Sequence, residues 1–285
     1  VKKERFLNLS VNNYFVKRDA ASLSIITVTY NSEKYIEQTI LSVINQHYSN
    51  IEYILIDGGS KDNTIKIIDK YKKFISYFIS EPDRNMYDAI NKGMRLATGD
   101  YIAVLNSDDY YIHDNVLDDV SKCLLEKKAY DGVYFDMIKV NSQGEKLSSV
   151  YRFDVNYKQL LFSRKLTFVG HESIFIKKEL IDSLGGYADD TFSAAADYDY
   201  ILRAFCKGIF CHYSMKILAF RIHDESITAS GKIEMEVERV LKNNRYYDYS
   251  LFKRYYYYYY LWGKFVVLNM ATILKKNFRR ILKNG

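Results

Sequence analysis

The feature that most constrains this chain is an alternation of short apolar stretches with helical patterns in its first 109 residues. Four stretches rich in β-branched and apolar residues have the composition of buried strands: residues 23–30, 51–56, 74–79 and 101–105. Between them, apolar residues recur at helical spacing in three segments: residues 31–46, 61–73 and 85–97. Short connections between such segments are typical of parallel strands whose linking helices cover both faces of the sheet. The alternation therefore predicts an α/β fold.

Polar side chains follow three of the predicted strands. Asn31 and Asp57 end the first two, and the strand Tyr101–Leu105 runs directly into Asn106-Ser107-Asp108-Asp109. In open α/β sheets, ligands bind at the carboxyl ends of the strands. Mg²⁺ and Mn²⁺ prefer oxygen ligands, and Mg²⁺ commonly takes one or two carboxylates together with substrate phosphates. We therefore predict a divalent metal on Asp108 and Asp109, held against a diphosphate; the alternative is a polar turn chosen only for its geometry.

Two common nucleotide-binding motifs are missing. No Gly-x-Gly-x-x-Gly follows the first strand, and no Gly-x-x-x-x-Gly-Lys-Ser/Thr occurs. These absences argue against a dehydrogenase and a P-loop enzyme. A nucleotidyltransferase would need a glycine-rich N-terminal loop with a basic residue, which is also missing. Any phosphates must be neutralised by another group, and a metal on the two aspartates would do so.

Length and cysteine content bound the class of protein. The 285 residues suffice for one large domain or a domain with an appendage, and 48% are hydrophobic, so a sizeable core is available. Three cysteines without Cys-x-x-Cys spacing favour a reducing compartment and no zinc site. We expect neither a signal peptide in residues 1–21 nor a membrane-spanning helix, because no apolar run is long enough.

The second half carries polar residues beside apolar strands. Residues 130–140 and 146–153 predict a strand pair, and residues 168–176 predict a strand interrupted by His171 and Glu172. Buried charge is costly unless paired, so these two lie at an active-site surface or bond to each other. Residues 194–203 predict a helix with Asp197 in its first turn, where an acid also suits the helix dipole.

The last 50 residues differ from the rest. Nine tyrosines fall between residues 245 and 260, and an apolar stripe near helical spacing follows: Trp262, Phe265, Val266, Met270, Ile273 and Leu274. Residues 241–285 hold ten lysines and arginines against one acid, whereas residues 1–240 are net acidic. Basic, aromatic, amphipathic segments suit an anionic membrane surface. The alternative is a helix packed on the body with a solvated basic face. We expect no nucleic-acid binding, because the body is acidic and lacks a binding motif.

Six segments occur in the following order: SIITVTYN (24–31), SVINQ (42–46), DGGSKDNT (57–64), EPDRNMYDAINKG (81–93), ATGDY (97–101) and LNSDD (105–109). In order and spacing they resemble family 2 glycosyltransferases, closest to the bacterial surface-polysaccharide type. The resemblance covers about residues 23–225. It implies a GT-A fold, a mixed and mainly parallel sheet flanked by helices, with a helical C-terminal extension. The implied parts are a lead (1–22), a nucleotide-sugar-binding half (23–113), an acceptor-binding half (114–230) and a basic aromatic helical tail (231–285).

The resemblance also implies roles for matching residues on the donor side. The implied nucleotide-sugar-binding residues are Thr29, Tyr30, Asn31, Asp57, Asp88, Lys92, Asn106, Asp108 and Arg221. Among them, Tyr30 would stack on the base and Asp57 would contact the base or ribose. Asp88 and Lys92 would lie near the sugar diphosphate, and Arg221, suited to bidentate contacts, would pair with phosphate. Mn²⁺ or Mg²⁺ would be held by Asp108, Asp109 and His223.

On the acceptor side, the resemblance places a general base in an acid just before an apolar-Arg helix. Asp197 takes that position, and Asp199 is the alternative. His171, Glu172 and Asp199 are assigned to the acceptor side. In inverting transfer, the acceptor hydroxyl attacks the anomeric carbon from the face opposite the nucleotide, and a carboxylate within hydrogen-bond reach removes its proton.

Three positions depart from the pattern. Gly58, Asn106 and Ala196 stand where many relatives have acids, and the missing acid at 58 often reads uracil. No Gln-x-x-Arg-Trp segment occurs, so we expect one sugar per encounter.

We therefore predict an inverting, metal-dependent, non-processive hexosyl- or N-acetylhexosaminyltransferase. It would use a nucleotide-diphospho-sugar, with UDP favoured as the commonest carrier, and a saccharide or lipid-linked acceptor in surface polysaccharide assembly. We expect a cytoplasmic protein, with peripheral attachment to the inner face of the plasma membrane through residues 241–285. The alternative is a catalytically silent GT-A module that binds nucleotide sugar or a partner protein.

Overall fold

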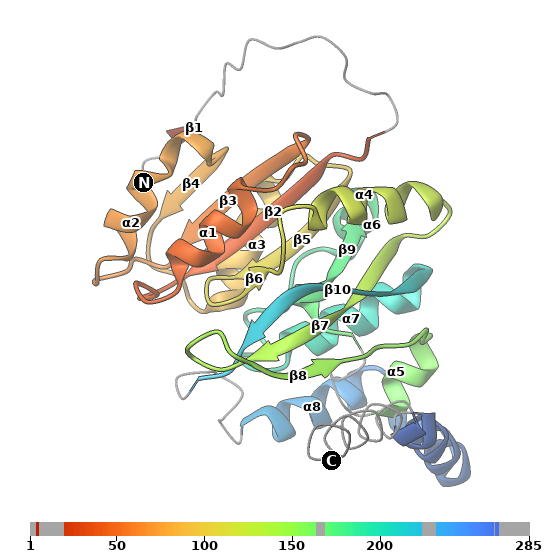
Figure 1. Cartoon of the computed structure of the whole chain (residues 1–285). Coiled ribbons are helices and arrows are strands. Elements are labelled where there is room, and N and C mark those ends of the chain that lie inside the picture. The colour runs from red at the N-terminus through yellow and green to blue at the C-terminus, as the bar shows by residue number, and fades with distance from the viewer. Residues whose placement is uncertain (1–3, 6–19, 164–168, 224–231, 265, 268–285) are drawn as a thin grey trace, which may run out of the picture.

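One mixed sheet organises the chain (Figure 1). The computed structural model describes residues 4–5, 20–163, 169–223, 232–264 and 266–267. Four strands of the first half run parallel: β2 (Leu23–Thr29), β3 (Ile51–Asp57), β4 (Tyr77–Ser80) and β5 (Tyr101–Asn106). They are connected through α1 (Ile36–Ile44), α2 (Thr64–Lys70), a 3-10 helix (Lys72–Phe74) and α3 (Met86–Leu96). A short strand, β1 (Glu4–Arg5), pairs antiparallel with β4 at the sheet edge.

The sheet continues into the second half without a break. There β9 (Ile174–Lys177) lies antiparallel between β5 and β7 (Gly132–Val140), and β10 (Phe210–Arg221) runs parallel to β7. Two further strands, β6 (Tyr110–Tyr111) and β8 (Lys146–Val150), pair antiparallel with β10 and β7. The order is β1-β4-β3-β2-β5-β9-β7-β10-β6, with β8 beside β7. The predicted mixed α/β fold is confirmed, whereas the boundaries between its parts stay predictions.

Alternate residues of the central strands enter two separate cores. On β2, Ile25 packs with α1, α2 and α4 (Val116–Glu126) on one face. Ile26 packs on the other face with α3, α5 (Tyr157–Ser163), α6 (Lys178–Leu184), α7 (Ala196–Lys207) and α8 (Lys232–Asn243). This is the period-2 burial of a strand covered on both sides. Gly93 lets α3 approach β2, because a Cβ there would lie 2.5 Å from Cγ2 of Ile26.

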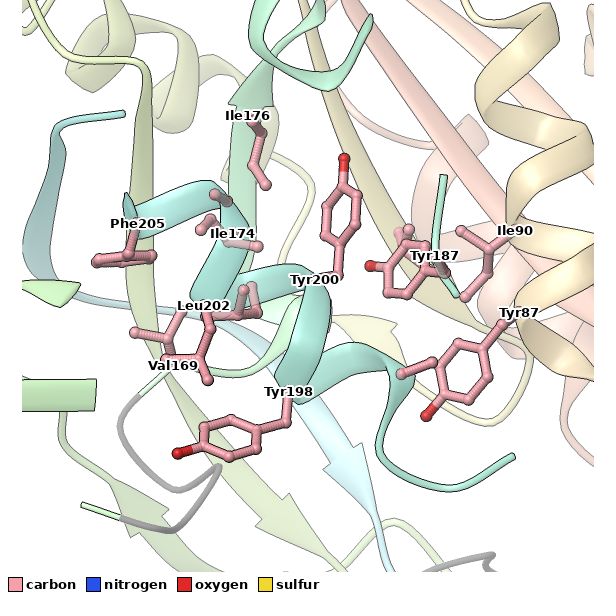
Figure 2. Packing of buried hydrophobic residues seen from close by; sticks show 14 of the residues in the cluster. Tyr87, Ile90, Val169, Ile174, Ile176, Tyr187, Tyr198, Tyr200, Leu202 and Phe205 are labelled. Atoms are coloured by element: carbon pink, nitrogen blue, oxygen red, sulfur yellow. The ribbon is translucent and has the colours of Figure 1, made fainter. Parts of the chain in front are cut away.

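Stacked tyrosines connect the two halves (Figure 2). Tyr187 stacks on Tyr200 of α7 with ring centroids 4.2 Å apart, and on Tyr87 of α3 at 5.5 Å. All three rings are buried. Offset aromatic pairs of this kind contribute stability beyond the area they bury. The row therefore fixes the start of α7 relative to the first turn of α3.

Several elements are shorter than predicted, among them β8, expected over 146–153, which ends at Val150. The strand expected at 168–176 begins only at Ile174, because His171–Ser173 form a 3-10 turn; Phe168 lies outside the described residues. The strand expected at 74–79 starts at Tyr77, since Lys72–Phe74 are helical, and the helix expected over 61–73 is only α2. At these two ends backbone i→i+3 hydrogen bonds replace the regular element: Ser173 N–H donates to the carbonyl of Gly170, and Phe74 N–H to that of Tyr71.

The described part of the tail is helical, as expected. It contains α8, a 3-10 turn (Tyr246–Asp248) and a helix over residues 251–264. Tyr257 stacks on Phe162 of α5, with ring centroids 4.9 Å apart and planes at 6°. Of the predicted stripe, Trp262 and Val266 are described, and the other members fall outside the described residues. Among the described helices, none is long and apolar enough to span a bilayer.

Candidate active site

The carboxyl end of β5 brings together the predicted metal-binding residues. Oδ2 of Asp108 lies 2.9 Å from Nε2 of His223, just past the end of β10. Both side chains are partly exposed, at 28% and 16%. The ring of Tyr35 lies 5.3 Å from the imidazole. A carboxylate and an imidazole thus meet at the strand-end edge, where the sequence predicts a diphosphate.

Asp109 lies behind this pair and is completely buried. Its Oδ1 accepts the backbone N–H of Arg221 at 2.8 Å. Burial, and next the negative charge of Asp108, raise the pKa of Asp109 well above its ordinary value. Asn106 donates its amide to the other carboxylate oxygen at 3.5 Å. These contacts point Asp109 into the protein, so its metal-binding role stays a prediction.

Asp108 and His223 suit a divalent ion better than Asp109 does. Carboxylate plus imidazole is a ligand set that Mn²⁺ accepts, and substrate phosphate oxygens would complete the shell. Within the described ranges, no cluster of three or more His, Cys, Asp or Glu side chains is placed to hold a metal. The residues present therefore fit an ion that binds together with a diphosphate rather than one caged by the protein alone.

Arg221 holds the turn that carries Asp108. Its Nε donates to the carbonyl oxygen of Asp108 at 3.0 Å, and Nη2 donates to Oε1 of Gln38 at 2.6 Å. Nη1 donates to the carbonyls of Asn141 and Ser142. The side chain is buried. These contacts favour a structural role, and the predicted phosphate contact remains a prediction.

The end of β2 forms an exposed platform. Tyr30 is 61% exposed, whereas Thr29 before it is buried. Asn31 has φ +49°, an unusual left-handed conformation that asparagine tolerates. Its Oδ1 accepts the N–H of Lys61 at 2.8 Å, and its own N–H donates to Oγ of Ser60 at 2.8 Å. Asn31 therefore joins the ends of β2 and β3 and leaves the Tyr30 ring open.

Asp57 is buried beneath this platform. Its carboxylate accepts the backbone N–H groups of Gly59 at 3.0 Å and Ser60 at 3.1 Å, and the hydroxyl of Ser80 at 2.7 Å. The Ser60 hydroxyl also donates to it. Because these partners occupy both oxygens, the geometry favours a role in shaping the loop; the predicted base or ribose contact is a separate prediction.

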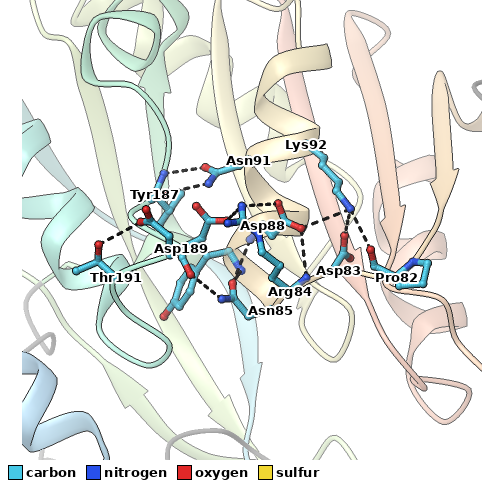
Figure 3. A network of polar contacts seen from close by, with 12 residues as sticks. Pro82, Asp83, Arg84, Asn85, Asp88, Asn91, Lys92, Tyr187, Asp189 and Thr191 are labelled. Carbon is cyan, nitrogen blue, oxygen red and sulfur yellow. Dashed lines mark hydrogen bonds and ion pairs between the residues drawn. The ribbon is translucent and has the colours of Figure 1, made fainter. Parts of the chain in front are cut away.

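Asp88 and Lys92 lie together in an acidic cluster at the start of α3 (Figure 3). Nζ of Lys92 lies 3.5 Å from Asp88, 3.0 Å from Glu81 and in direct contact with Asp83. Asp88 also receives Nη2 of Arg84 at 3.2 Å. With the ammonium shared among three carboxylates, the cluster is better suited to binding sugar hydroxyls than to attracting phosphate.

Asp83 is a further candidate, and the sequence pattern alone assigns it no role. A Cβ added to Gly58 would lie 3.1 Å from Oδ2 of Asp83 and 3.4 Å from the ring of Tyr30. Burial raises the pKa of Asp83, although contact with Lys92 opposes that effect. A carboxylate therefore stands beside the ring of Tyr30, next to the position of Gly58.

A loop from the second half closes onto α3 (Figure 3). Asn91 makes two hydrogen bonds to the backbone of Tyr187, at 2.7 and 2.9 Å. Asn85 caps α3 through the N–H groups of Tyr87 and Asp88, and its amide donates to the carbonyl of Asp189. These contacts place the chain leading to α7 against the donor half.

Asp197 is at the start of α7, as predicted. Its Oδ2 lies 3.7 Å from Nδ1 of His171, and its side chain is 18% exposed. Burial alone would lower the pKa of His171, but contact with Asp197 and the charge of Glu172 outweigh it, and the pKa is raised. Burial, and then the charge of Asp197, raise the pKa of Tyr87 as well. A carboxylate, an imidazole and a phenol from three elements thus converge.

The other acceptor-side acids are engaged elsewhere. Oδ2 of Asp199 accepts Nε of Arg203 at 2.7 Å, and Arg203 also donates to the carbonyls of Leu184 and Gly186. Glu172 is buried and folds over Gly170, where a Cβ would lie 2.4 Å from its carboxylate. Asp197 therefore remains the acid best placed to act as a base.

Solved structures share this architecture. The fragment of Staphylococcus aureus TarS (residues 1–349) in complex with UDP-GlcNAc superposes with a TM-score of 0.61 at 18% identity, covering 77% of this chain and 65% of that one. Mannosyltransferase PcManGT from Pyrobaculum calidifontis, in complex with GDP-Man and Mn²⁺, gives a TM-score of 0.56 at 17% identity, covering 78% and 70%. The GT-A fold expected from the sequence is thereby confirmed.

Sequence relatives point the same way. An uncharacterized glycosyltransferase of Mycobacterium tuberculosis is 32% identical over 187 residues, which is 65% of this chain and 69% of the relative. A PGL/p-HBAD biosynthesis glycosyltransferase of Mycobacterium bovis is 29% identical over 189 residues, covering 65% and 70%. The family model described as glycosyl transferase family 2 matches residues 24–184, more than half of the chain. This chain is a member of glycosyl transferase family 2.

Proposed function

We propose that this enzyme transfers one sugar, with inversion, from a nucleotide-diphospho-sugar to a saccharide or lipid-linked saccharide in the assembly of a surface polysaccharide. The observation that carries the proposal is the separation of its acids into two groups. Asp108 meets His223 at the strand-end edge, whereas Asp197 meets His171 at the start of α7. Inverting transfer needs this division. Negative charge develops on the leaving diphosphate on one side of the sugar, while the acceptor hydroxyl loses its proton on the other side.

The donor platform favours a carrier whose base presents a ring N–H, which is uridine, thymidine or guanosine. The open ring of Tyr30 offers a stacking surface, and Oδ2 of Asp83 lies beside it next to Gly58. A carboxylate only accepts hydrogen bonds, so it would pair with a base that presents an N–H donor beside the ring of Tyr30. Uracil, thymine and guanine present a ring N–H for this contact, whereas neutral cytosine offers only its exocyclic amino group. The solved relatives with UDP-GlcNAc and GDP-Man fall within this class.

A bound Mn²⁺ or Mg²⁺ would offset the charge that develops on the leaving diphosphate. Asp108 and His223 would hold it, with Arg221 fixing the backbone of Asp108 from behind. The acidic cluster around Lys92 would orient the donor sugar through its hydroxyls. Each of these residues acts on the donor and none on the acceptor.

The acceptor reacts on the other side. Asp197 takes the proton of the acceptor hydroxyl as its oxygen bonds to the anomeric carbon and the bond to the diphosphate oxygen breaks. The nucleoside diphosphate leaves, and Asp197 later returns the proton to solvent. The backbone N–H of Tyr198 donates to Oδ1 of Asp197 at 2.8 Å, whereas Oδ2 faces Nδ1 of His171 at 3.7 Å, longer than a hydrogen bond.

Release of nucleoside diphosphate from a panel of UDP-, GDP- and dTDP-sugars tests this proposal, with Mn²⁺ and extracted saccharide acceptors present. Replacing Asp197 by Asn should lower turnover about 10²- to 10⁴-fold, the usual contribution of a general base, while nucleotide binding stays within a few-fold. Full turnover in the Asp197→Asn variant would remove that residue from its role. Nucleotide binding without turnover of any donor would favour the silent module.

We also propose that the tail holds the enzyme at the cytoplasmic face of an anionic membrane. Residues 251–264 contain three basic residues and no acid. Six aromatic side chains of this helix are exposed: Phe252, Tyr255, Tyr256, Tyr259, Tyr260 and Trp262. Aromatic rings with adjacent positive charge suit the membrane interface. A lipid-linked acceptor would be presented there.

Trp262 gives a direct test of membrane binding, because it is the single tryptophan of the chain and is 57% exposed. Vesicles containing anionic lipid should shift its fluorescence to shorter wavelength, and neutral vesicles should do so much less. Unchanged emission and no sedimentation with anionic vesicles would contradict the proposal.

A further inference from the structure

A carboxylate from the C-terminal segment holds the turn that carries Asp197. Glu236 of α8 accepts the backbone N–H of Ser193 at 3.0 and 3.1 Å, of Ala194 at 2.7 Å and of Ala195 at 2.9 Å. It also accepts the Ser193 hydroxyl at 2.8 Å. Three consecutive backbone donors therefore converge on one side chain, about 40 residues away in sequence.

These donors need an external partner. The three N–H groups lie in the turn that precedes α7, which begins at Ala196 after the N-cap residue Ala195. Ala194 and Ala195 are buried, so solvent does not reach them, and a buried backbone N–H needs a hydrogen-bond partner. Glu236 supplies that partner from another element. It supplies a carboxylate close to the position where Ala196 departs from the family pattern.

A second contact from α8 supports the same turn. The guanidinium of Arg239, one turn after Glu236, lies 5.4 Å from the ring centroid of Phe192. Phe192 is buried in the core beneath α7. Two residues on one face of α8 thus contact residues 192–195, and Asp197 lies two positions after this turn.

The electrostatics agree with a charged Glu236. Burial would raise the pKa of its carboxyl, but the hydrogen bonds from Ser193, Ala194 and Ala195 outweigh burial and lower the pKa. The charge of Glu236 also contributes to the raised pKa of Tyr87, after burial and Asp197. Glu236 is therefore close enough to influence the site as well as the backbone.

We propose that Glu236 is a positioning residue for catalysis: it fixes the turn Ser193–Ala195 so that Asp197 is aimed at the acceptor hydroxyl. The inference rests on the proposed role of Asp197. If Glu236 has this role, α8 is part of the active site rather than an appendage. Nucleotide binding by the donor half should then not depend on Glu236.

Steady-state kinetics of Glu236→Ala and Glu236→Gln test the proposal, with Glu234→Gln as the matched control. Glu234 is an exposed acid on the same helix. Misplacing a reacting group by about 1 Å can cost about 100-fold in rate. We expect kcat to fall about 10- to 100-fold in Glu236→Ala and less in Glu236→Gln, which keeps one acceptor oxygen. The donor KM and nucleotide affinity should stay within two-fold, and the control should match the wild type.

Asp197→Asn, measured beside these variants, separates the two proposals. If Asp197→Asn loses activity while Glu236→Ala keeps its kcat, the positioning role of Glu236 is overturned and the assignment of Asp197 as the base is retained. A parallel loss of nucleotide affinity and kcat in Glu236→Ala would mean general unfolding and would also overturn it. If Asp197→Asn is fully active, the base assignment fails instead. If Glu236→Ala does not fold, amide hydrogen exchange of residues 193–199 in Glu236→Gln tests the positioning role instead. Faster exchange than in the wild type supports that role, and unchanged exchange contradicts it.

Discussion

Replacing Asp57 by Ala separates a loop-shaping role from a nucleotide contact. The carboxylate is fully buried and accepts the N–H groups of Gly59 and Ser60 and the hydroxyl of Ser80. A hydrogen bond to a charged group contributes about 1.5–3 kcal/mol, and a buried donor left without a partner costs a similar amount. Because the Ser80 hydroxyl can rotate to another acceptor, most of the loss of stability comes from the two backbone N–H donors. We expect a loss of about 3 kcal/mol, a large share of the roughly 5–15 kcal/mol that stabilises a typical domain.

Thermal unfolding without ligand measures this loss, and the midpoint should fall by about 5–10 °C. Ser80→Ala is the matched control, since it removes one donor but leaves the carboxylate its other partners; it should cost only about 1 kcal/mol. An Asp57→Ala protein that melts within about 1 °C of the wild type, yet binds nucleotide ten-fold more weakly, would contradict the loop-shaping role and place Asp57 in contact with the ligand.

Three further changes have expected outcomes. Asp109→Asn should stabilise the metal-free protein at neutral pH. The folded protein raises the pKa of this acid, so stability is lost as pH rises above the unfolded value of about 3.9; a denaturation series in EDTA should show the gain vanish near pH 4. Arg221→Lys should destabilise by about 2–4 kcal/mol in urea unfolding, because an ammonium cannot reach all the buried acceptors of the guanidinium. Tyr257→Ala should free the helix 251–264 from Phe162, seen as faster proteolysis there with donor turnover unchanged.

The elements of the donor half could be predicted because each is set by local pattern. A strand buried on both faces must be continuously apolar, and Tyr101–Leu105 is followed by polar residues where the strand ends. The strand predicted at 168–176 was too long because a contact with another element sets its start. His171 must turn toward Asp197, on another element, and the 3-10 turn allows this where the alternation of a strand would not.

The contacts that distinguish individual site residues were beyond sequence reasoning. Arg221 and Glu236 each bind backbone groups that are distant in sequence, and nothing in their neighbours indicates those partners. The proximity of Asp83 to Gly58 likewise depends on how the ends of β3 and β4 approach. A resemblance can identify which positions form a site, but the buried or open state of each carboxylate requires the fold.

The metal and diphosphate site at Asp108 and His223 is best tested by thermal unfolding with UDP, GDP, dTDP and CMP, each with Mn²⁺ or with EDTA. At about 100 times Kd, a ligand of the native state adds about 2.7 kcal/mol of stability. We predict such a shift for UDP, GDP or dTDP with Mn²⁺, little with CMP because it lacks the diphosphate, and a much smaller shift in EDTA or in His223→Ala. No shift with any nucleotide, or an equal shift in EDTA and in His223→Ala, would contradict a diphosphate and metal bound at Asp108 and His223.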